Sequence, residues 1–512
     1  MKLLNRDEAR KLDTLAMNTY GLPEAVLMEN AGASVVALTE GDVSWKDARV
    51  VILCGSGNNG GDGFVTARYV SLAEADVVVF LMGDESHMSD ASRLYYQVCE
   101  KMVIPVRKIK KAEEAQPFLD DADIIVDALI GIGLRQGVSG EKADLIDRAN
   151  ASRAVRIAVD IPSGLICDSG QAEGAVIHAD YTVTMGTLKR AHILYPGNEY
   201  CGSVKVSPIG IPGGAADEFP AEWVTASDVK PLIPVRTRIS HKGSNGYLGI
   251  IAGSQGMAGA GLLAAQGALY AGAGKISLFT PQSPAEELTG LLPEIMVRPA
   301  SAYGEFRGEN VVDILSGTDA CDVLAIGPGL GRKQETQDFV CQVLEESEGP
   351  IIVDADALYA VAAKKFPLRS CGGRLILTPH VGEFARLTGK SAAEIEQHRI
   401  DMAASYAREN QVILVLKGAP TVTAAPDGRI AVNSTGNPGM ATGGSGDVLT
   451  GVIAALAAYG LSAADAARTG AFMHGLAGDI AAESLGQWGM TSLDIEMALP
   501  EAFKRITEEK HT

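Results

Sequence analysis

A glycine-rich segment in the last fifth of the chain places flexible backbone directly before a carboxylate. Gly443, Gly444, Ser445 and Gly446 precede Asp447 within GNPGMATGGSGDVLTG, and an apolar run of helical length follows. Because glycine has no Cβ, backbone N–H groups can turn toward one point, at which the following helix also aims its positive end. The segment predicts an anion hole for a phosphoryl group in transfer, with Asp447 acting as a base or only as a helix cap.

This phosphate site does not follow the Walker A pattern. The segment FARLTGKS ends as that motif does, but Phe384 stands where its first glycine is required. We therefore expect the glycine-rich helix start, rather than a P-loop, to handle phosphate.

A second glycine-rich segment, CGSGNNGGDGF, follows a short apolar run and precedes a helical pattern. Residues 55–60 match G-x-G-x-x-G, which indicates either a dinucleotide-binding turn or only a tight turn. Asn58, Asn59 and Asp62 exceed what phosphate binding by backbone N–H groups needs. Their amide and carboxylate oxygens are hard ligands, so we expect this loop to hold a cation or a polar headgroup.

Two further strand exits carry polar side chains of the same kind. VDALIGIGLRQG places Asp127 at a strand end before a flexible loop, 131–137, and VDIPSG places Asp160 and Ser163 at another. Ligands of open α/β sheets bind at the carboxyl ends of strands, so these segments should converge. Asp127 and Asp160 are either site residues or structural carboxylates that cap the following turns.

Apolar strands alternate with helical patterns along the chain, which predicts parallel α/β sheets. Asn5 is the predicted N-cap of the first helix. This alternation of strands and helices is interrupted at residues 213–225, which are rich in Pro and Gly. We therefore expect two α/β domains, residues 1–216 with a Rossmann-like doubly wound sheet and residues 225–512 with a second α/β fold.

Composition excludes several classes of partner. The formal charge of −19 over 512 residues repels nucleic acid and anionic lipid surfaces. The seven Cys show no C-x-x-C pair, so neither a disulfide framework nor a structural zinc site is expected. The N-terminus reaches charged residues too early for a signal peptide, and no uncharged stretch is long enough to span a membrane. We expect a cytoplasmic protein that binds neither nucleic acid nor membranes.

GSGNNGGDGF, VDALIGIGLRQG and VDIPSG together resemble the NAD(P)H-hydrate epimerase domain, across roughly residues 1–215. The resemblance implies a potassium ion held by Asn59, Asp127 and Ser163, and makes Asp160 a substrate-contacting acid–base residue. It also implies that two segments bind the hydrated dinucleotide. Their residues are Asn58, Asn59, Gly60, Gly61, Asp62, Gly131, Ile132, Gly133, Leu134, Arg135, Gln136 and Gly137.

The implied reaction requires proton transfer, which a carboxyl group can provide. The hydrated ring carries a hydroxyl on a carbon beside the ring nitrogen, and its configuration inverts when the hydroxyl leaves and returns to the other face. Hydroxide is a poor leaving group, so a positioned carboxyl that donates and recovers a proton contributes about 10²–10⁴-fold. Asp160 is the residue that we expect in this role.

G-x-G-D before a helix is typical of ribokinase-like folds, and Gly444 to Asp447 match it. Six segments in order, GSQGMAGAG, AIGPGLGR, VDADAL, LTPHVGEFARL, KGAPT and NPGMATGGSGDVLTG, resemble the ADP/ATP-dependent NAD(P)H-hydrate dehydratases over about residues 230–507. The resemblance implies a ribokinase-like second domain. It also implies a nucleotide site and a second site for the hydrated dinucleotide. The implied nucleotide-binding residues are Lys417, Gly418, Ala419, Pro420, Thr421 and Gly446, and the implied substrate-binding residues are Ala260, Gly329, His380 and Asp447.

In this scheme Asp447 deprotonates the ring hydroxyl, which attacks a terminal phosphate, and the phosphate ester then leaves readily. Mg²⁺ is expected to bridge the nucleotide phosphates, without ligands that the sequence identifies. His380 could instead only cap the following helix, and Lys417 could be a solvated charge at a strand end.

The whole chain is thus interpreted as a bifunctional repair enzyme that epimerises hydrated NADH or NADPH and dehydrates the S form. The alternatives are a ribokinase-type kinase fused to a Rossmann dehydrogenase, and a first domain that only senses nucleotides or acts as a scaffold. The sequence leaves open ADP against ATP as donor, with ADP favoured, and NADH against NADPH. It also leaves open whether an intermediate passes between the sites. A homo-oligomer is expected.

Overall fold

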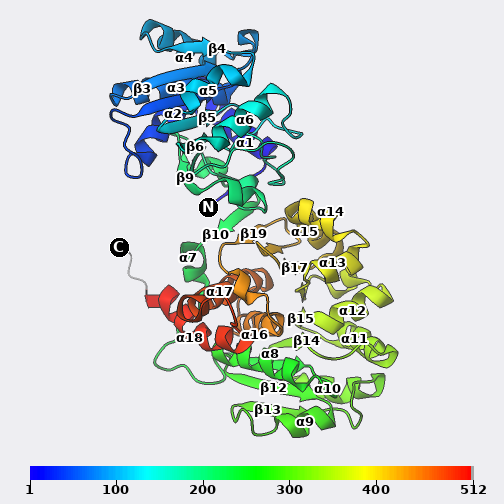
Figure 1. Ribbon diagram of the computed structural model, residues 1–512. Helices are drawn as coiled ribbons and strands as arrows, with labels where there is room; N and C mark the ends of the chain where they lie inside the picture. The colour runs from blue at the N-terminus through cyan, green and yellow to red at the C-terminus, as the bar shows by residue number, and fades with distance from the viewer. Residues whose placement is uncertain (509–512) are drawn as a thin grey trace. The chain divides into compact units, whose positions relative to one another are not determined.

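The computed structural model describes residues 1–508, and the chain divides into two compact units, residues 1–221 and 222–512 (Figure 1). Residues 509–512, which the predicted second domain includes, lie outside the described part. Each unit is built on a sheet that is wholly or largely parallel, so the predicted α/β fold class is confirmed.

The N-terminal unit contains a seven-stranded parallel sheet of order β4-β3-β2-β5-β6-β7-β9. Chain order runs outward from β2 on one side and from β5 on the other, so the topological switch point lies between these strands. A ligand site is expected outside the carboxyl ends there. The strands are β2 (Arg49–Cys54), β3 (Asp76–Leu81), β4 (Val106–Lys108), β5 (Ile124–Ala128), β6 (Val155–Val159), β7 (Tyr181–Met185) and β9 (Ser203–Ser207).

Helices cover both faces of this sheet (Figure 1). They are α2 (Glu24–Thr39), α3 (Asn58–Leu72), α4 (Asp90–Lys101), α5 (Gln116–Leu119) and α6 (Glu141–Ala151), whereas α1 (Arg6–Asn18) packs in separate apolar clusters. Successive side chains of a strand point to opposite faces. Val50 and Ile52 of β2 therefore join the apolar cluster with α2, α3 and α4, whereas Val51 and Leu53 join the cluster with α5 and α6.

The C-terminal unit contains a ten-stranded sheet of order β10-β19-β18-β17-β16-β15-β14-β11-β12-β13. From β13 to β17 the pairs are parallel, whereas β18 pairs antiparallel with both β17 and β19. The sequence analysis did not identify this antiparallel pair of strands. The strands are β10 (Ala221–Val224), β11 (Tyr247–Ile251), β12 (Lys275–Thr280), β13 (Ile295–Pro299), β14 (Val323–Ile326), β15 (Ile351–Val353), β16 (Leu375–Leu377), β17 (Ile413–Leu416), β18 (Val422–Ala424) and β19 (Ile430–Asn433).

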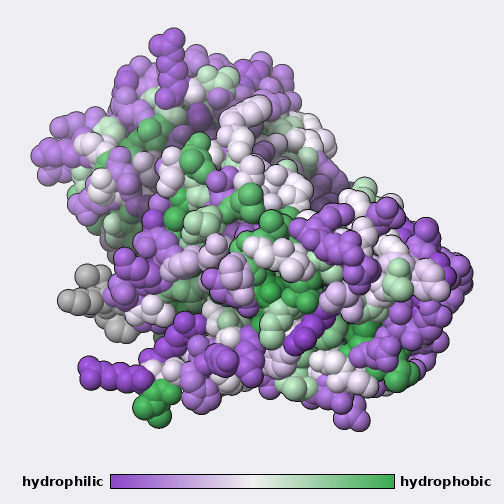
Figure 2. Space-filling view, turned by 90° about the horizontal axis from the view of Figure 1, so that it is seen from below, coloured by the Kyte–Doolittle hydropathy of each residue, from purple (hydrophilic) through white to green (hydrophobic). Residues whose placement is uncertain are grey.

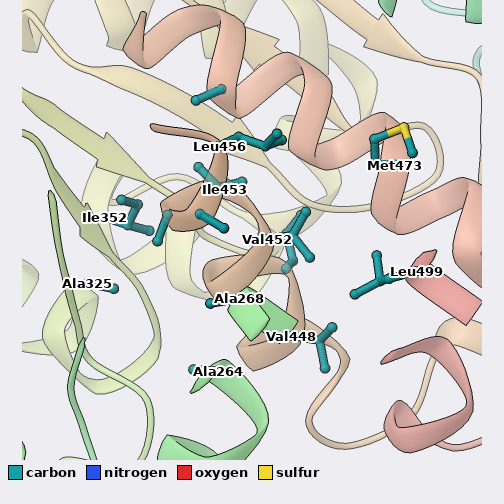
Figure 3. Close-up of a cluster of buried hydrophobic side chains, with 14 of the residues drawn as sticks. Ala264, Ala268, Ala325, Ile352, Val448, Val452, Ile453, Leu456, Met473 and Leu499 are labelled. Carbon is teal, nitrogen blue, oxygen red and sulfur yellow. The ribbon is translucent and has the colours of Figure 1, made fainter. Parts of the chain in front are cut away.

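The core of this unit is built around α16, which is buried along nearly its whole length. Figure 3 shows its apolar side chains packed among residues of α8, α17, α18, β14 and β15. The helices of the unit are α7 (Ala226–Val229), α8 (Ala258–Tyr270), α9 (Gln282–Leu288), α10 (Val311–Thr318), α11 (Gln334–Glu346), α12 (Ala355–Lys364), α13 (Val381–Thr388), α14 (Ala392–Gln397), α15 (Arg399–Asn410), α16 (Ser445–Ala458), α17 (Ala463–Leu485) and α18 (Ser492–Glu508).

The molecular surface carries mostly polar side chains on the face drawn in Figure 2, with hydrophobic side chains in smaller groups between them. Within residues 1–508, no helix combines the length and the apolar character that crossing a membrane requires.

Helices α8 and α16 approach closely because each presents a glycine to the other. A Cβ on Gly451 would lie 2.0 Å from the carbonyl oxygen of Ala264, and one on Gly267 would lie 2.6 Å from that of Val448. Both distances are far shorter than van der Waals contact. The backbones of the two helices therefore touch directly, which fixes the position of α16 and of its N-terminus.

This contact predicts that Gly451→Ala destabilises the protein. Overpacking a core typically costs about 1–3 kcal/mol, which exceeds the gain of up to about 1 kcal/mol from replacing glycine in a helix. Chemical denaturation should show that loss. The matched control is Gly259→Ala in the first turn of α8, where a Cβ meets no atom within 4 Å. The control should be neutral or stabilising, and equal effects of the two substitutions would contradict the close helix contact.

Two candidate active sites

A cavity of about 900 Å³ opens at the carboxyl end of the N-terminal sheet. It lies at the switch point, because the segments that follow β2, β5 and β6 all line it, together with one face of α1. Most of the predicted substrate-binding residues contribute to its wall. These are Asn58, Asn59, Asp62, Gly131, Ile132, Gly133, Leu134, Arg135, Gln136 and Asp160.

Three predicted glycines lie outside the cavity wall. A Cβ on Gly60 would lie 1.9 Å from the carbonyl oxygen of Gly55, and one on Gly137 would lie 2.0 Å from that of Glu173. Gly61 is similarly closed in by the side chains of Ser92 and Met28. Their contacts show that these glycines permit close packing behind the site.

The interpretation of NNGGD as a loop is wrong. Helix α3 begins at Asn58, with Gly57 as its N-cap, so these residues form the first turns of the helix. The side chain of Asn58 donates to Glu24 Oε1 at 2.8 Å. The positive N-terminal end of α3 thus lies at the cavity, where it favours negatively charged ligand groups.

Asp127 and Ser163, both fully buried, are hydrogen-bonded to each other, and neither lines the cavity wall. Asp127 Oδ1 accepts from Ser163 Oγ at 2.6 Å and Oδ2 from Ser163 N at 2.7 Å, while Leu129 N also donates to Oδ1 at 3.2 Å. Burial raises the pKa of Asp127 to about 6, although these hydrogen bonds oppose the shift. Its carboxyl group is held in place by the chain itself.

The amide of Asn59 supplies the third predicted cation ligand. It lies against Gly131, where a Cβ would come within 3.2 Å of Asn59 Oδ1, and its buried Nδ2 has no hydrogen-bond partner. An amide with one unpartnered end can present its oxygen to a cation after a flip. Among residues 1–508, no three His, Cys, Asp or Glu side chains gather as a metal site, so any ion here relies on mixed oxygen ligands.

Asp160 is held as an ionised carboxylate. Its Oδ1 accepts from Lys189 Nζ at 2.5 Å, Thr184 Oγ1 at 3.0 Å and Met185 N at 3.2 Å. Burial pushes the pKa of Asp160 up, but the charge and hydrogen bond of Lys189 outweigh it, so the pKa lies below its ordinary value. The backbone of Asp160 has φ +66°, an uncommon conformation for a non-glycine residue that recurs at functional sites.

Two other carboxyl groups line the same cavity without a hydrogen-bond partner in the described chain, those of Asp13 on α1 and Asp62 on α3. Burial raises the pKa of Asp13 to about 6 and that of Asp62 well above its ordinary value. The sequence analysis missed Asp13 and Lys189. Neither lies in a glycine-rich segment, so only the fold brings them to the site.

The glycine turn of the C-terminal unit is open to solvent, as an anion hole requires. A Cβ on Gly443 would meet no atom within 4 Å, and Gly444, with φ +89°, forms the N-cap of α16. Gly444 packs against Leu263 of α8, where a Cβ would approach Leu263 Cδ1 to 2.4 Å. The N-terminus of α16 is thus fixed on its inner side and exposed on its outer side.

An ion pair between the partly exposed Lys417 and the buried Asp354 lies under this helix start. Lys417 Nζ contacts Asp354 Oδ1 at 2.9 Å, and Thr450 Oγ1 donates to Asp354 Oδ2 at 2.8 Å. Gly446 makes room for the ammonium group, because a Cβ there would lie 2.9 Å from Lys417 Nζ. Burial lowers the pKa of Lys417, but Asp354 overrides that effect and raises it. Lys417 is therefore not a solvated charge at a strand end.

Asp447 is a half-buried carboxyl group in the first turn of α16. Its pKa is raised to about 7, mainly by burial and also by the charge of Asp354, while Lys417 acts in the opposite direction. Its carboxyl group makes no hydrogen bond to the described residues 1–508. A carboxyl group with this pKa and no partner in the described chain can take a proton near neutral pH.

The remaining predicted residues form two groups around this centre. Ala260 and Gly329 are neighbours, since a Cβ on Gly329 would lie 3.0 Å from Ala260 Cβ. His380 caps α13, its Nδ1 accepting from Gly382 N at 3.0 Å, which is the role that the sequence left open as the alternative, and substrate binding by His380 stays a prediction. Its side chain is still 57% exposed, so it remains accessible to a ligand.

The segment Lys417, Gly418, Ala419, Pro420 and Thr421 follows β17 directly. Its shape depends on Arg399, which the sequence analysis missed. Arg399 Nη1 donates to the carbonyl oxygens of Leu416, Lys417 and Pro420 at 3.3–3.4 Å.

Comparison with known proteins finds relatives along the whole chain. Residues 248–501 match the family model of NAD(P)H-hydrate dehydratase, and residues 24–191 match that of the YjeF-related protein N-terminus. The bifunctional NAD(P)H-hydrate repair enzyme Nnr of Thermofilum pendens is 41% identical over 513 residues, which cover 99% of this chain and 97% of the relative.

Solved structures match the C-terminal unit. A ribokinase-like superfamily protein of Enterococcus faecalis is 26% identical, with a TM-score of 0.51, over 56% of this chain and 97% of that one. The ADP/ATP-dependent NAD(P)H-hydrate dehydratase of Bacillus subtilis, co-crystallised with ATP and Mg²⁺, is 31% identical, with a TM-score of 0.47, over 56% of this chain and 98% of that one. The Enterococcus structure confirms the predicted ribokinase-like fold.

The ion pair of Asp354 and Lys417 predicts that Asp354→Asn strongly destabilises the C-terminal unit. Removing one partner leaves the Lys417 ammonium uncompensated, which typically costs about 3–5 kcal/mol. Chemical denaturation of Asp354→Asn, Lys417→Met and the double variant measures the coupling. The double variant should lose less free energy of unfolding than the two single variants lose together. Strictly additive losses would contradict an energetic coupling between Asp354 and Lys417.

Proposed function

The chain belongs to the family of bifunctional NAD(P)H-hydrate repair enzymes, and on that premise we propose that each of its two units catalyses one step of the repair. The N-terminal unit epimerises the R and S forms of hydrated NADH or NADPH. The C-terminal unit dehydrates the S form, with ADP rather than ATP proposed as the phosphoryl donor.

In the N-terminal cavity, Asp160 is proposed to exchange protons with the substrate. The ring nitrogen expels the hydroxyl as water, and water then adds to the other face of the ring. Because Lys189 keeps Asp160 ionised, this carboxylate is suited to accept the proton of the water that adds. The positive end of α3 and the side chain of Arg135, both at the cavity, suit the phosphates of the dinucleotide.

Asn59, Asp127 and Ser163 are proposed to hold potassium. Their amide, carboxylate and hydroxyl oxygens are hard donors, and the amide of Asn59, whose Nδ2 has no hydrogen-bond partner in the described chain, could turn its oxygen toward a cation. A bound potassium ion would add positive charge beside an anionic substrate.

In the C-terminal unit, Asp447 is proposed to accept the proton of the ring hydroxyl as it attacks the terminal phosphate. The open turn at Gly443, the N-terminus of α16 and Lys417 would stabilise the charge on the transferring group. The resulting phosphate ester is a good leaving group, and its departure with loss of a ring proton restores the dihydropyridine.

The acidic side chains around Asp447 do not offer an evident Mg²⁺ site. Asp354 is bonded to Lys417, Asp356 to Arg332, and Glu383 to the backbone of His380. We therefore assign no ligand to the Mg²⁺ expected with the nucleotide. One observation carries the proposal: Asp447, unpartnered in the described chain and with a pKa raised to about 7, lies beside an open glycine turn and close to the ion pair of Lys417 and Asp354.

The test follows the absorbance of the reduced ring when the S form is incubated with ADP or ATP. Asp447→Asn should lower the rate of restoration by about 10²–10⁴-fold and leave epimer exchange unchanged, because the second site alone loses its base. In the parent chain the rate should rise with pH through about 7, since the base works only when ionised. Accumulation of a stable phosphorylated product would instead indicate a small-molecule kinase, and loss of both activities would contradict independent sites.

A homo-oligomer is also proposed. Large apolar side chains are exposed around the junction of α17 and α18, and burial against a second copy would remove them from water. They are Leu485, Trp488, Leu493 and Met497, with 58, 98, 52 and 67% of their surface exposed. Light scattering should give a multiple of the chain mass that falls for Trp488→Ser with Leu493→Ser. A monomeric parent chain would contradict the proposal.

A further inference from the structure

Epimerisation needs two proton transfers on opposite faces of one ring. The departing hydroxyl must gain a proton to leave as water, and the water that adds to the other face must lose one. The hydrogen bond from Lys189 keeps Asp160 ionised, and its Oδ1 accepts three hydrogen bonds in all. Asp160 is therefore suited to take the proton from the water that adds. The first transfer needs a different group in the cavity.

Three other carboxyl groups line the cavity, those of Asp13, Glu24 and Asp62. Glu24 accepts a hydrogen bond from Asn58, so it is occupied. Asp62 lies on α3, which follows strand β2 of the sheet, as Asp160 follows β6. Asp13 lies on α1, which is not attached to a strand of this sheet.

Helix α1 forms a separate wall, and its position is fixed by the chain before it. Strand β1 (Leu3–Leu4) pairs in parallel with β8 (Leu188–Lys189), with Leu4 opposite Lys189. A capping box at Asn5 then starts α1 directly after β1, so the β1–β8 pair sets where the helix begins. One face of the helix lines the cavity through Ala9, Arg10, Leu12, Asp13 and Met17.

We propose that Asp13 is the second acid–base residue of this cavity and acts on the ring face opposite to Asp160. The proposal rests on the proposed epimerase activity. In one direction Asp13 gives its proton to the hydroxyl, the C–O bond breaks as the nitrogen lone pair forms a C=N bond, and water leaves. A water molecule then adds to the other face, forming a new C–O bond as its proton passes to Asp160. The reverse reaction uses the two carboxyl groups in exchanged roles.

The surroundings of Asp13 suit a proton donor. Burial raises its pKa to about 6, the charges of Asp160 and Glu24 act in the same direction, and Lys189 opposes them. The carboxyl group makes no hydrogen bond to the described chain, so both oxygens are free for substrate. Among the carboxyl groups that line the cavity, that of Asp13 is the one carried by α1.

The experiment measures epimer exchange by proton NMR in the full chain, without nucleotide, so that the second site is idle. Asp13→Asn should lower kcat by at least about 100-fold with KM changed only a few-fold, and Asp13→Glu should recover part of the rate. In the parent chain kcat should fall as pH rises through about 6, because the donor must be protonated, and the variant should lack this limb.

Asp7→Asn is the matched control, because it makes the same change on an exposed side chain of the same helix. It should retain the parental rate. Chemical denaturation of each variant, followed by a probe in the N-terminal unit, shows that this unit is folded, since dehydration of the S form reports only on the C-terminal unit. A rate within twofold of the parent for Asp13→Asn, or a loss confined to KM, would overturn this inference while the epimerase function stands. Absence of exchange in the parent chain would overturn the epimerase function and the inference together.

Discussion

Parallel strands end at one edge of their sheet, and this constraint gathers the polar side chains of both units. In the N-terminal unit it brings together the exits of β2, β5 and β6, and in the C-terminal unit those of β15 and β17. The carboxyl groups placed there are shielded from solvent, which by itself raises their pKa values. Whether each is ionised near neutral pH then depends on whether a cationic side chain lies beside it. Lys189 keeps Asp160 ionised, whereas Asp447 has no such partner and has a pKa of about 7.

The chain must bind polyanionic ligands although its net charge is −19. Charges beyond about 8–10 Å are screened at physiological salt, so the groups at each site decide the local potential. Helix starts supply part of it, through α3 at the first site and α16 at the second. Lys417 supplies a full charge under α16, and its pairing with Asp354 keeps it in place before any ligand binds. The pKa of Asp447 is raised to about 7 mainly by burial, and the two members of this pair shift it in opposite directions.

Local sequence patterns predicted those features of the fold that are determined by residues adjacent in the chain. The capping role of Asn5, the parallel strands and the family were confirmed, since each follows from a few adjacent residues or from ordered motifs. Asp13 and Arg399 could not be found in this way. Each acts on segments distant in the sequence, through the β1–β8 pairing or through bonds to the 416–420 backbone. The start of α3 at Asn58 was missed because consecutive glycines and asparagines favour a loop by propensity, and packing against Gly55 and Met28 overrides it.

The central claim is that the two sites act in series on one ligand, so that the R form reaches the dehydratase only through the epimerase. The most direct measurement is the rate at which the reduced-ring absorbance returns from pure R form with ADP, in the parent chain and in Asp160→Asn. The account predicts that Asp160→Asn restores the S form at the parental rate and the R form only as fast as uncatalysed epimerisation supplies it. Restoration of the R form at the parental rate would contradict it.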